Sequence, residues 1–271
     1  MSNLKILYAA SEIAPFSKAS TLVTEQVKQL ILAMQDKGID LRILVPRFDL
    51  INERKHRLHE VVRLSGTSVM MGPVMYQLVV KVASIPGTRC QIYFMDPGTP
   101  FGVDTTRENH ADYAITDHDE RLIFFCKATL ATVRNLEWSP DIVHCHDWMT
   151  SLIPLYLKTT WRRDRILRRV KTIHTFYNKA FPGKWKAKLG EKANMLGIEE
   201  GEKLRSLATN TLGELIQMAM QHTDTLTRAE ELEAKHPLKS MLREREASHI
   251  VLDTAGVEAY YNLYTRLAKV R

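Results

Sequence analysis

The chain has 271 residues, of which 45% are hydrophobic and 25% charged, a composition typical of a soluble globular protein with one good core or two small ones. No run approaches the roughly 18 apolar residues that a membrane-spanning helix requires, so we expect no membrane segment. The formal charge of +7 allows attraction to anions but establishes no partner.

The cysteines and the N-terminal residues indicate a cytoplasmic protein. The chain has 3 cysteines, an odd number, and each lies in an apolar segment, as reduced thiols do. Lys5 and Glu12 interrupt the first apolar stretch, which therefore indicates a strand and not a signal peptide.

The first elements along the chain predict a strand–helix–strand unit. An apolar run at residues 4–10 predicts a buried strand, and residues 41–45 predict a second strand that Pro46 ends. Between them, Thr21 is a suitable helix N-cap and Gly38 a suitable stop. The apolar residues of this helix recur at helical spacing: Val23, Val27, Leu30, Ile31 and Met34.

The rest of the chain continues the alternation of strands and helices. Short runs broken by glycine and proline over residues 60–95 predict a meander inserted at the sheet edge, and residues 96–116 indicate a loop. The further predicted elements are helix 117–134, strand 142–145, helix 150–157, strand 170–173, a partly irregular stretch 179–205, helix 204–221, strand 224–227 and a closing helix 257–268. The fold class is α/β, with a Rossmann-like parallel sheet flanked by helices.

Polar side chains follow three of the predicted strands at the point where each strand ends. The motif D-I-V-H-C-H-D-W at residues 141–148 ends an apolar run in two histidines, Asp147 and Trp148. His174 ends a second strand, and Lys18 lies in the loop after the first. Parallel strands carry their ligands at the C-terminal edge of the sheet, so we expect Lys18, Asp147 and His174 to converge on one cleft there.

Several motifs, in order along the chain, resemble one known family. They are K-I-L-Y-A-A-S-E-I-A-P-F-S-K, G-I-D-L-R-I-L-V-P-R-F, I-Y-F-M-D, W-S-P-D-I-V-H-C-H-D-W and T-I-H. The chain is similar to the N-terminal domain of bacterial glycogen synthases and plant starch synthases, retaining glucosyltransferases of the two-domain GT-B type. The resemblance is strong over residues 1–182, weaker over 204–229 and faint over 260–267. It implies a single GT-B-type N-terminal domain over 1–227 and a helical tail over 228–271 that packs back on it.

The resemblance implies that the first loop, K-T-G-G-L in typical members, holds the diphosphate of a nucleotide sugar and contacts the acceptor glucan. Here the matching residues are Lys18, Ala19, Ser20, Thr21 and Leu22, so the lysine is present and both glycines are replaced. If the loop needed positive φ, Ser20 and Thr21 would each add about 1–3 kcal/mol of strain. The alternative is that Ser20 and Thr21 only cap the following helix.

The family motifs H-D-W-H and T-x-H-N line the donor-sugar pocket, and the resemblance carries this role to Asp147, Trp148 and His174. Met149 and Thr175 replace the other two motif residues. Asp147 and Trp148 could equally serve as a helix cap and a packing anchor. His144, His146, Asp147 and His174 suggest a metal set, but the resemblance implies neither metal nor cofactor, and we expect none.

The family's second domain supplies an arginine and a lysine to the diphosphate and an acidic residue to the glucose. After Thr227 only 44 residues follow here, and they read as helices. We therefore expect a degenerate synthase-like pseudoenzyme, without independent transfer activity, that acts as a binding or regulatory module. One alternative is an active half that needs a separate partner domain. Another is a scaffold for a protein partner.

Two further features bear on partners. Residues 158–171 (the basic segment, K-T-T-W-R-R-D-R-I-L-R-R-V-K) carry seven cations and one acid, which suit an acidic partner, nucleic acid or polyphosphate, or form only a solvated surface. Tyr260, Tyr261 and Tyr264 lie on the apolar face of the closing helix, which we expect to be buried. We expect weak contact with a nucleotide sugar or α-glucan, a protein partner or second copy over the former interdomain face, and neither membrane nor nucleic acid.

Overall fold

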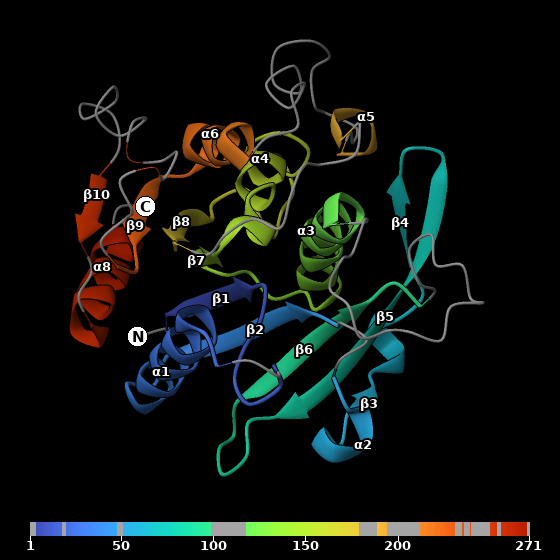
Figure 1. The fold of residues 1–271 in the computed structure, drawn as a ribbon, viewed down its shortest axis with the longest axis horizontal. Helices are drawn as coiled ribbons and strands as arrows, with labels where there is room; N and C mark the ends of the chain where they lie inside the picture. The colour runs from blue at the N-terminus through green and yellow to red at the C-terminus, as the bar shows by residue number, and fades with distance from the viewer. Residues whose placement is uncertain are drawn as a thin grey trace.

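A computed structural model describes residues 4–17, 20–47, 51–98, 118–178, 189–193, 212–230, 235, 239, 250–253 and 256–269. These residues form a 10-stranded sheet with the order β10-β9-β8-β7-β1-β2-β6-β5-β3, in which β4 pairs with β5 (Figure 1). Its strands are β1 (Lys5–Ala10), β2 (Asp40–Pro46), β3 (His59–Glu60), β4 (Thr67–Met71), β5 (Val74–Ser84), β6 (Gln91–Asp96), β7 (Ile142–His146), β8 (Lys171–Phe176), β9 (Thr225–Arg228) and β10 (Ile250–Asp253).

The centre of the sheet is parallel, as the strand–helix–strand pattern predicts. Strand β1 pairs in parallel with β2 and with β7, and β6, β8, β9 and β10 extend the parallel part. The meander predicted over residues 60–95 is only partly at the edge. Its strands β3, β4 and β5 are antiparallel, whereas β6 pairs with β2 inside the main sheet.

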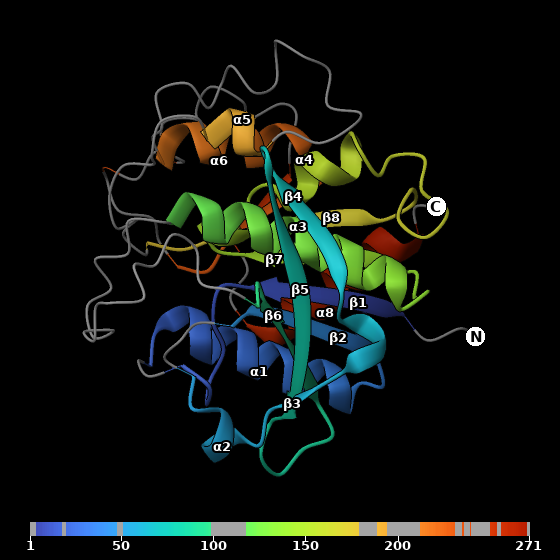
Figure 2. The same ribbon diagram turned by 90° about the vertical axis from the view of Figure 1, so that its right-hand side faces the viewer.

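Helices cover both faces of the sheet (Figure 2). On one face lie α1 (Leu22–Asp36) and α8 (Val257–Lys269), which share a core with alternate residues of β1 such as Ile6 and Tyr8. On the other face lie α3 (His118–Asn135), α4 (Ile153–Lys158), α5 (Leu189–Ala193) and α6 (Leu212–His222), which pack against Leu7 and Ala9 of the same strand. This alternation is what a strand buried on both faces produces.

The C-terminal part contains a strand that the sequence did not predict. We expected helices after Thr227, but Ile250–Asp253 forms β10, which extends the sheet beside β9. The helix predicted over 150–157 is also divided, into a 3₁₀ turn at Trp148–Thr150 and then α4. Residues 99–116 of the predicted loop, residue 117 of the helix predicted after it and the first part of helix 204–221 lie outside the described residues.

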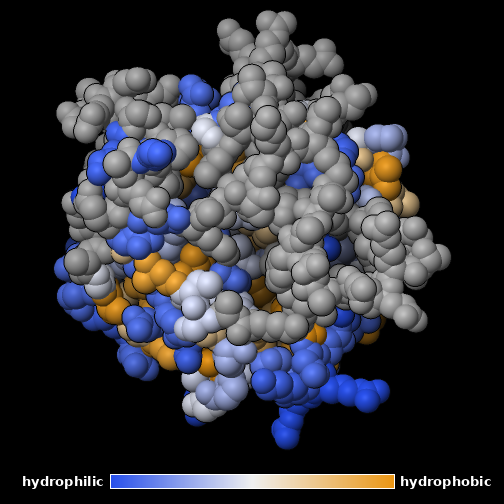
Figure 3. Space-filling view, viewed as in Figure 1, coloured by the Kyte–Doolittle hydropathy of each residue, from blue (hydrophilic) through white to orange (hydrophobic). Residues whose placement is uncertain are grey.

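The hairpin of β4 and β5 is the main exposed apolar feature of the described residues. Met70, Val74 and Met75 are each about half exposed near its turn. Figure 3 shows hydrophobic atoms at this position. Within the described ranges, no helix is both long enough and apolar enough to cross a bilayer.

Candidate active site

Asp147 lies at the C-terminal edge of the sheet, directly after β7. Its carboxylate accepts a hydrogen bond from Ser11 Oγ at 2.9 Å and another from the Trp148 backbone N–H at 2.7 Å. The Asp147 backbone N–H donates to the Thr175 carbonyl, 3.1 Å away, at the end of β8. Asp147 therefore joins the ends of three adjacent parallel strands, through its side chain to Ser11 after β1 and through its backbone to β8.

The backbone of Asp147 is strained. Its φ of 69° and ψ of 168° fall in a region that is otherwise almost reserved for glycine. A residue held there costs about 1–3 kcal/mol, and it persists only where its surroundings fix it. The bonds to Ser11, Trp148 and Thr175 provide that fixing, and strain of this kind clusters at functional sites.

His174 is fully buried near the end of β8, on the same face of the strand as Phe176, against which its ring stacks at 4.4 Å between centroids. Neither ring nitrogen makes a hydrogen bond of good geometry among the described residues, although the Asp147 backbone lies close enough to oppose the lowering of the His174 pKa. Burial lowers the pKa of His174 to about 3, so the ring is neutral at pH 7. Burying a polar ring without a good hydrogen bond reduces stability, and a bound ligand could supply the missing bond. His174 is therefore a candidate for ligand contact.

Trp148 is buried in the core beside Met149, and its contact with a ligand stays a prediction. Asp147 and His174 lie at the same edge of the sheet because both belong to the ends of neighbouring parallel strands. Lys18 lies outside the described residues, so the convergence of all three side chains on one cleft stays a prediction.

Ser20 and Thr21 occupy the positions of the family's glycine pair, at the start of α1. Thr21 is the N-cap, with φ −116° and ψ 164°, and its side chain accepts from the Thr24 backbone N–H. Thr21 Oγ1 also donates to Glu12, and Ser20 Oγ donates to Glu25, each at 2.9 Å. The start of the helix is therefore capped by its own side chains and has two carboxylates beside it.

The histidines of the H-x-H motif face away from His174. His144 and His146 lie on the face of the sheet that α8 covers, where His144 Nδ1 is 2.7 Å from the Tyr264 hydroxyl and His146 Nδ1 is 2.8 Å from the Tyr177 hydroxyl. Register pairs His174 with Cys145, which lies in the core of the opposite face. The described residues hold no group of three or more side chains placed to bind a metal ion.

Burial lowers the pKa of both motif histidines, that of His144 well below its usual value and that of His146 to about 3. Their neighbours Tyr8, Tyr177 and Tyr264 are fully or almost fully buried, and burial raises the pKa of each. This network is thus uncharged at pH 7, and its bond between His144 and Tyr264 joins α8 to the sheet.

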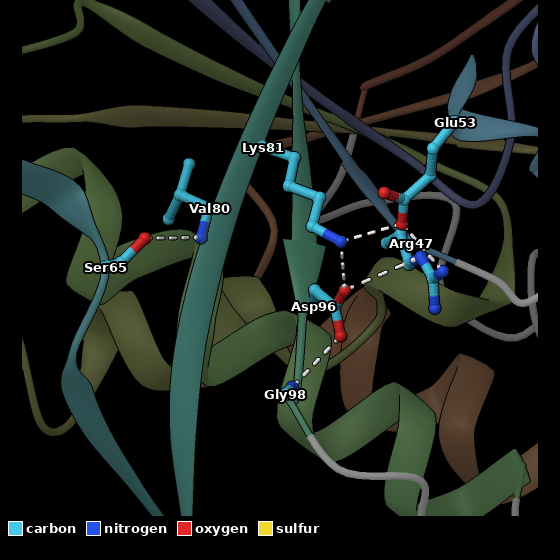
Figure 4. Close-up of polar contacts among 7 residues, drawn as sticks. All are labelled: Arg47, Glu53, Ser65, Val80, Lys81, Asp96 and Gly98. Carbon is cyan, nitrogen blue, oxygen red and sulfur yellow. Dashed lines mark hydrogen bonds and ion pairs between the residues drawn. The ribbon is translucent and has the colours of Figure 1, made fainter. Parts of the chain in front are cut away.

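A cluster of charged residues at the same edge of the sheet was not singled out from the sequence (Figure 4). Arg47, which follows β2, pairs with Glu53 at 2.7 Å and with Asp96 at 3.5 Å. Lys81 of β5 pairs with the same two carboxylates, at 2.7 Å and 3.3 Å. The hydrogen bond from Lys81 is the main reason that the pKa of Glu53 is lowered. Asp96 Oδ1 also accepts from the Gly98 backbone N–H, which fixes the chain as it leaves β6. In the sequence, Arg47 and Asp96 are the charged residues that end the motifs V-P-R and F-M-D, directly after two apolar runs. This position was the sequence signal that could have identified the cluster.

Comparison with known proteins identifies the family. A family model described as the starch synthase catalytic domain matches residues 5–238. Glycogen synthases of Chlorobium luteolum and Chlorobium limicola are each 34% identical over 235 residues, covering 86% of this chain and 47% of the relative. The chain thus spans about half the length of these relatives.

A solved structure shares the fold. The catalytic domain of Starch Synthase IV from Arabidopsis thaliana, bound to ADP and acarbose, matches with a TM-score of 0.68 and 20% identity, over 96% of this chain and 53% of that one. At this identity the likeness concerns the fold alone. Together with the family model and the glycogen synthase relatives, it supports one conclusion: the chain belongs to the starch synthase catalytic domain family.

Proposed function

We propose that this chain is a glycogen/starch-synthase-like protein that does not transfer glucose by itself and acts as a binding or regulatory module. The observation that carries the proposal is the start of α1. Thr21 uses its hydroxyl to cap the Thr24 backbone N–H, which a phosphate oxygen would otherwise meet. The side chains of Ser20 and Thr21 also fill space that glycine leaves open for a diphosphate.

Charge adds to this argument. Glu12 and Glu25 accept hydrogen bonds from Thr21 and Ser20, so two carboxyl groups lie at the end of the helix where a diphosphate would have to bind. These two carboxylates would repel a negatively charged diphosphate, whereas the positive end of the helix dipole alone would attract it.

Weak contact with a nucleotide or an α-glucan is retained in this proposal. The Arabidopsis starch synthase structure holds ADP and acarbose. By the motif resemblance, Lys18 belongs to the loop that holds the diphosphate, and Asp147, Trp148 and His174 belong to the motifs that line the donor-sugar pocket. The ring of His174, whose nitrogens make no hydrogen bond of good geometry among the described residues, supports contact with a ligand at this edge.

A different observation favours a second candidate, an active half that works with a separate nucleotide-binding domain. The strained backbone of Asp147 and the buried His174 ring, which makes no hydrogen bond of good geometry among the described residues, reduce stability, and such costs are typical of groups kept for function. The two candidates differ in one respect, which is whether a second domain restores turnover.

Two measurements test the proposal. Calorimetric titration with ADP, ADP-glucose, UDP-glucose and maltooligosaccharides should show weak binding or none, and the variant Ser20→Gly/Thr21→Gly should bind ADP more tightly than the original chain. A transfer assay with ADP-glucose or UDP-glucose and glycogen should give no turnover above a heat-killed control. Turnover that Asp147→Ala abolishes would overturn the proposal, and turnover only after adding the C-terminal half of a Chlorobium glycogen synthase would establish the second candidate.

A further inference from the structure

The basic segment (residues 158–171) forms a well-ordered turn between α4 and β8. Asp164 Oδ1 accepts hydrogen bonds from the backbone N–H groups of Ile166 and Leu167, at 2.8 Å and 3.2 Å. The Trp161 backbone N–H donates to the Tyr156 carbonyl at 2.9 Å, and Leu167 is buried in the core. Hydrogen bonds and core packing thus fix the backbone of this turn. A ligand that binds its outward side chains would not lose free energy by ordering the backbone.

The outward side chains are arginines without an acidic partner. Asp164, the one acid of the basic segment, faces inward and pairs with Arg134 at 3.5 Å, while Lys158 pairs with Asp224 at 2.8 Å. Five arginines are exposed and make no ion pair within the described part of the chain: Arg162, Arg163, Arg165, Arg168 and Arg169. Seven cations and one acid give the basic segment a formal charge of +6, close to the +7 of the whole chain.

The chemistry of this surface favours phosphate over protein. Protein interfaces rely on a buried apolar centre with aromatic anchors. Among the described residues, the exposed large apolar side chains lie outside the basic segment. Trp161, the aromatic residue of the segment, is partly buried, and the Arg134 guanidinium lies 5.5 Å from its ring centroid. Guanidinium groups bind phosphate in a bidentate manner, and release of counterions from a polyanion drives such binding without any apolar contact.

We propose that the basic segment is a binding site for a phosphate polyanion, either the backbone of a nucleic acid or inorganic polyphosphate, held by the five arginines without contacts to bases. Nucleic acid was not expected as a partner from the sequence. The fixed turn and its unpaired arginines are the structural reasons to consider it. Lys171 starts β8 and His174 lies toward its other end, so this site is at the opposite edge of the sheet from Asp147 and does not depend on the proposed function.

The test is fluorescence anisotropy with three labelled probes: a 20-base-pair DNA duplex, inorganic polyphosphate and poly-glutamate. Five phosphate contacts predict a slope of log affinity against log salt of about −4.5 on the duplex, which is about a 500-fold loss of affinity between 50 and 200 mM NaCl. The turn variant replaces the five arginines: R162Q, R163Q, R165Q, R168Q and R169Q. A matched control replaces five other exposed cations: R54Q, K55Q, R57Q, R63Q and R89Q. Both variants keep a formal charge of +2, since each removes five from +7.

The control variant should bind within about threefold of the original chain, and the turn variant at least about 100-fold more weakly with a slope near zero. If the turn variant does not fold, R162Q/R163Q should still reduce the slope by about 2. Binding of polyphosphate alone identifies free polyphosphate as the ligand, and binding of the duplex identifies a nucleic-acid backbone. The proposal is wrong if poly-glutamate binds equally well, if the two quintuple variants bind alike, or if no phosphate probe binds at 50 mM NaCl.

Discussion

The hydroxyl of Tyr264 lies 2.7 Å from Nδ1 of His144, which joins the last helix to the centre of the sheet. The same hydroxyl is 2.9 Å from that of Tyr8. On its other side, His144 Nε2 is 2.7 Å from the Thr175 hydroxyl, which in turn is 2.6 Å from that of Thr227. Helix α8 is thus held by a chain of buried hydrogen bonds as well as by apolar packing, and the Tyr264 hydroxyl takes part in two of these bonds.

Replacing Tyr264 with phenylalanine should destabilise the protein although it removes only one oxygen atom. His144 Nδ1 and the Tyr8 hydroxyl would lose a partner in a fully buried place, at a cost of about 1–3 kcal/mol. The midpoint of thermal unfolding should fall by about 2–12 °C. Tyr261→Phe is the control, because Tyr261 is partly exposed and its ring would keep the contact with Lys37. Equal melting of both variants and the original chain would contradict this role of Tyr264.

Truncation at Asp253 should yield an insoluble or much less stable protein. It removes Tyr260, Leu263 and Tyr264, which are buried against the sheet and α1, and each such side chain contributes about 1.5–3 kcal/mol. The sum is comparable with the whole stability of a domain. Solubility and thermal melting of the truncated and full chains measure the effect. If both chains melt at the same temperature, α8 is a free appendage.

Stability should fall as the pH is lowered from 6.5. Burial holds the pKa of His146 and His174 at about 3 and that of His144 well below its usual value, whereas unfolding returns each to about 6.5. Between these values the unfolded state binds protons that the folded state does not, so acid favours unfolding. Each histidine contributes up to about 1.4 kcal/mol per pH unit. Urea unfolding between pH 5 and 7.5 tests this in a range above carboxylate titration, and a flat profile would contradict it.

His174→Leu should raise stability at pH 7. The substitution removes a buried polar ring whose nitrogens make no hydrogen bond of good geometry among the described residues, a gain of about 1–2 kcal/mol. The substitution should also reduce the loss of unfolding free energy per pH unit below pH 6.5 by the contribution of His174. His146→Leu is the matched control and should destabilise, because the Tyr177 hydroxyl loses its bond. Loss of stability in His174→Leu would mean that the ring has a structural partner and is not retained for a ligand.

Thr21→Ala should cost about 0.5–2 kcal/mol, because the N-cap bond to the Thr24 backbone N–H is lost. Thr21→Ser keeps the hydroxyl and should have little effect. Chemical unfolding of the three proteins measures the difference. If alanine is as stable as serine here, Thr21 does not act as the cap of α1 in solution.

Local patterns were enough to predict much of the fold. The spacing of Val27, Leu30, Ile31 and Met34 and the cap at Thr21 identified α1, because helix periodicity and capping depend only on near neighbours. Apolar runs identified β1 and β7 in the same way. The edge of the sheet that carries Asp147 and His174 followed from the rule that parallel strands end together.

Features that depend on distant partners were not predictable. The left-handed backbone of Asp147 requires Ser11 and Thr175, which come from other strands. The charged cluster of Arg47 and Lys81 likewise forms only when β2, β5 and β6 are aligned. Strand β10 was missed because a short strand at the end of a sheet has little local signal, and pairing with β9 decides its structure.

The hydrogen bond between Tyr8 and Tyr264 spans 256 positions, nearly the whole chain, and this has a consequence for synthesis on the ribosome. At about 5–20 residues per second, the first strand is made roughly 13–50 s before its partner in α8. During that interval the face of β1 and β7 that carries Tyr8 and His144 has α1 but lacks α8, and a transiently exposed apolar face makes a nascent chain prone to aggregation. The docking of α8 on the sheet therefore cannot precede the synthesis of this helix, and a delay or an error in that part of the chain leaves the Tyr8 side of the sheet without it.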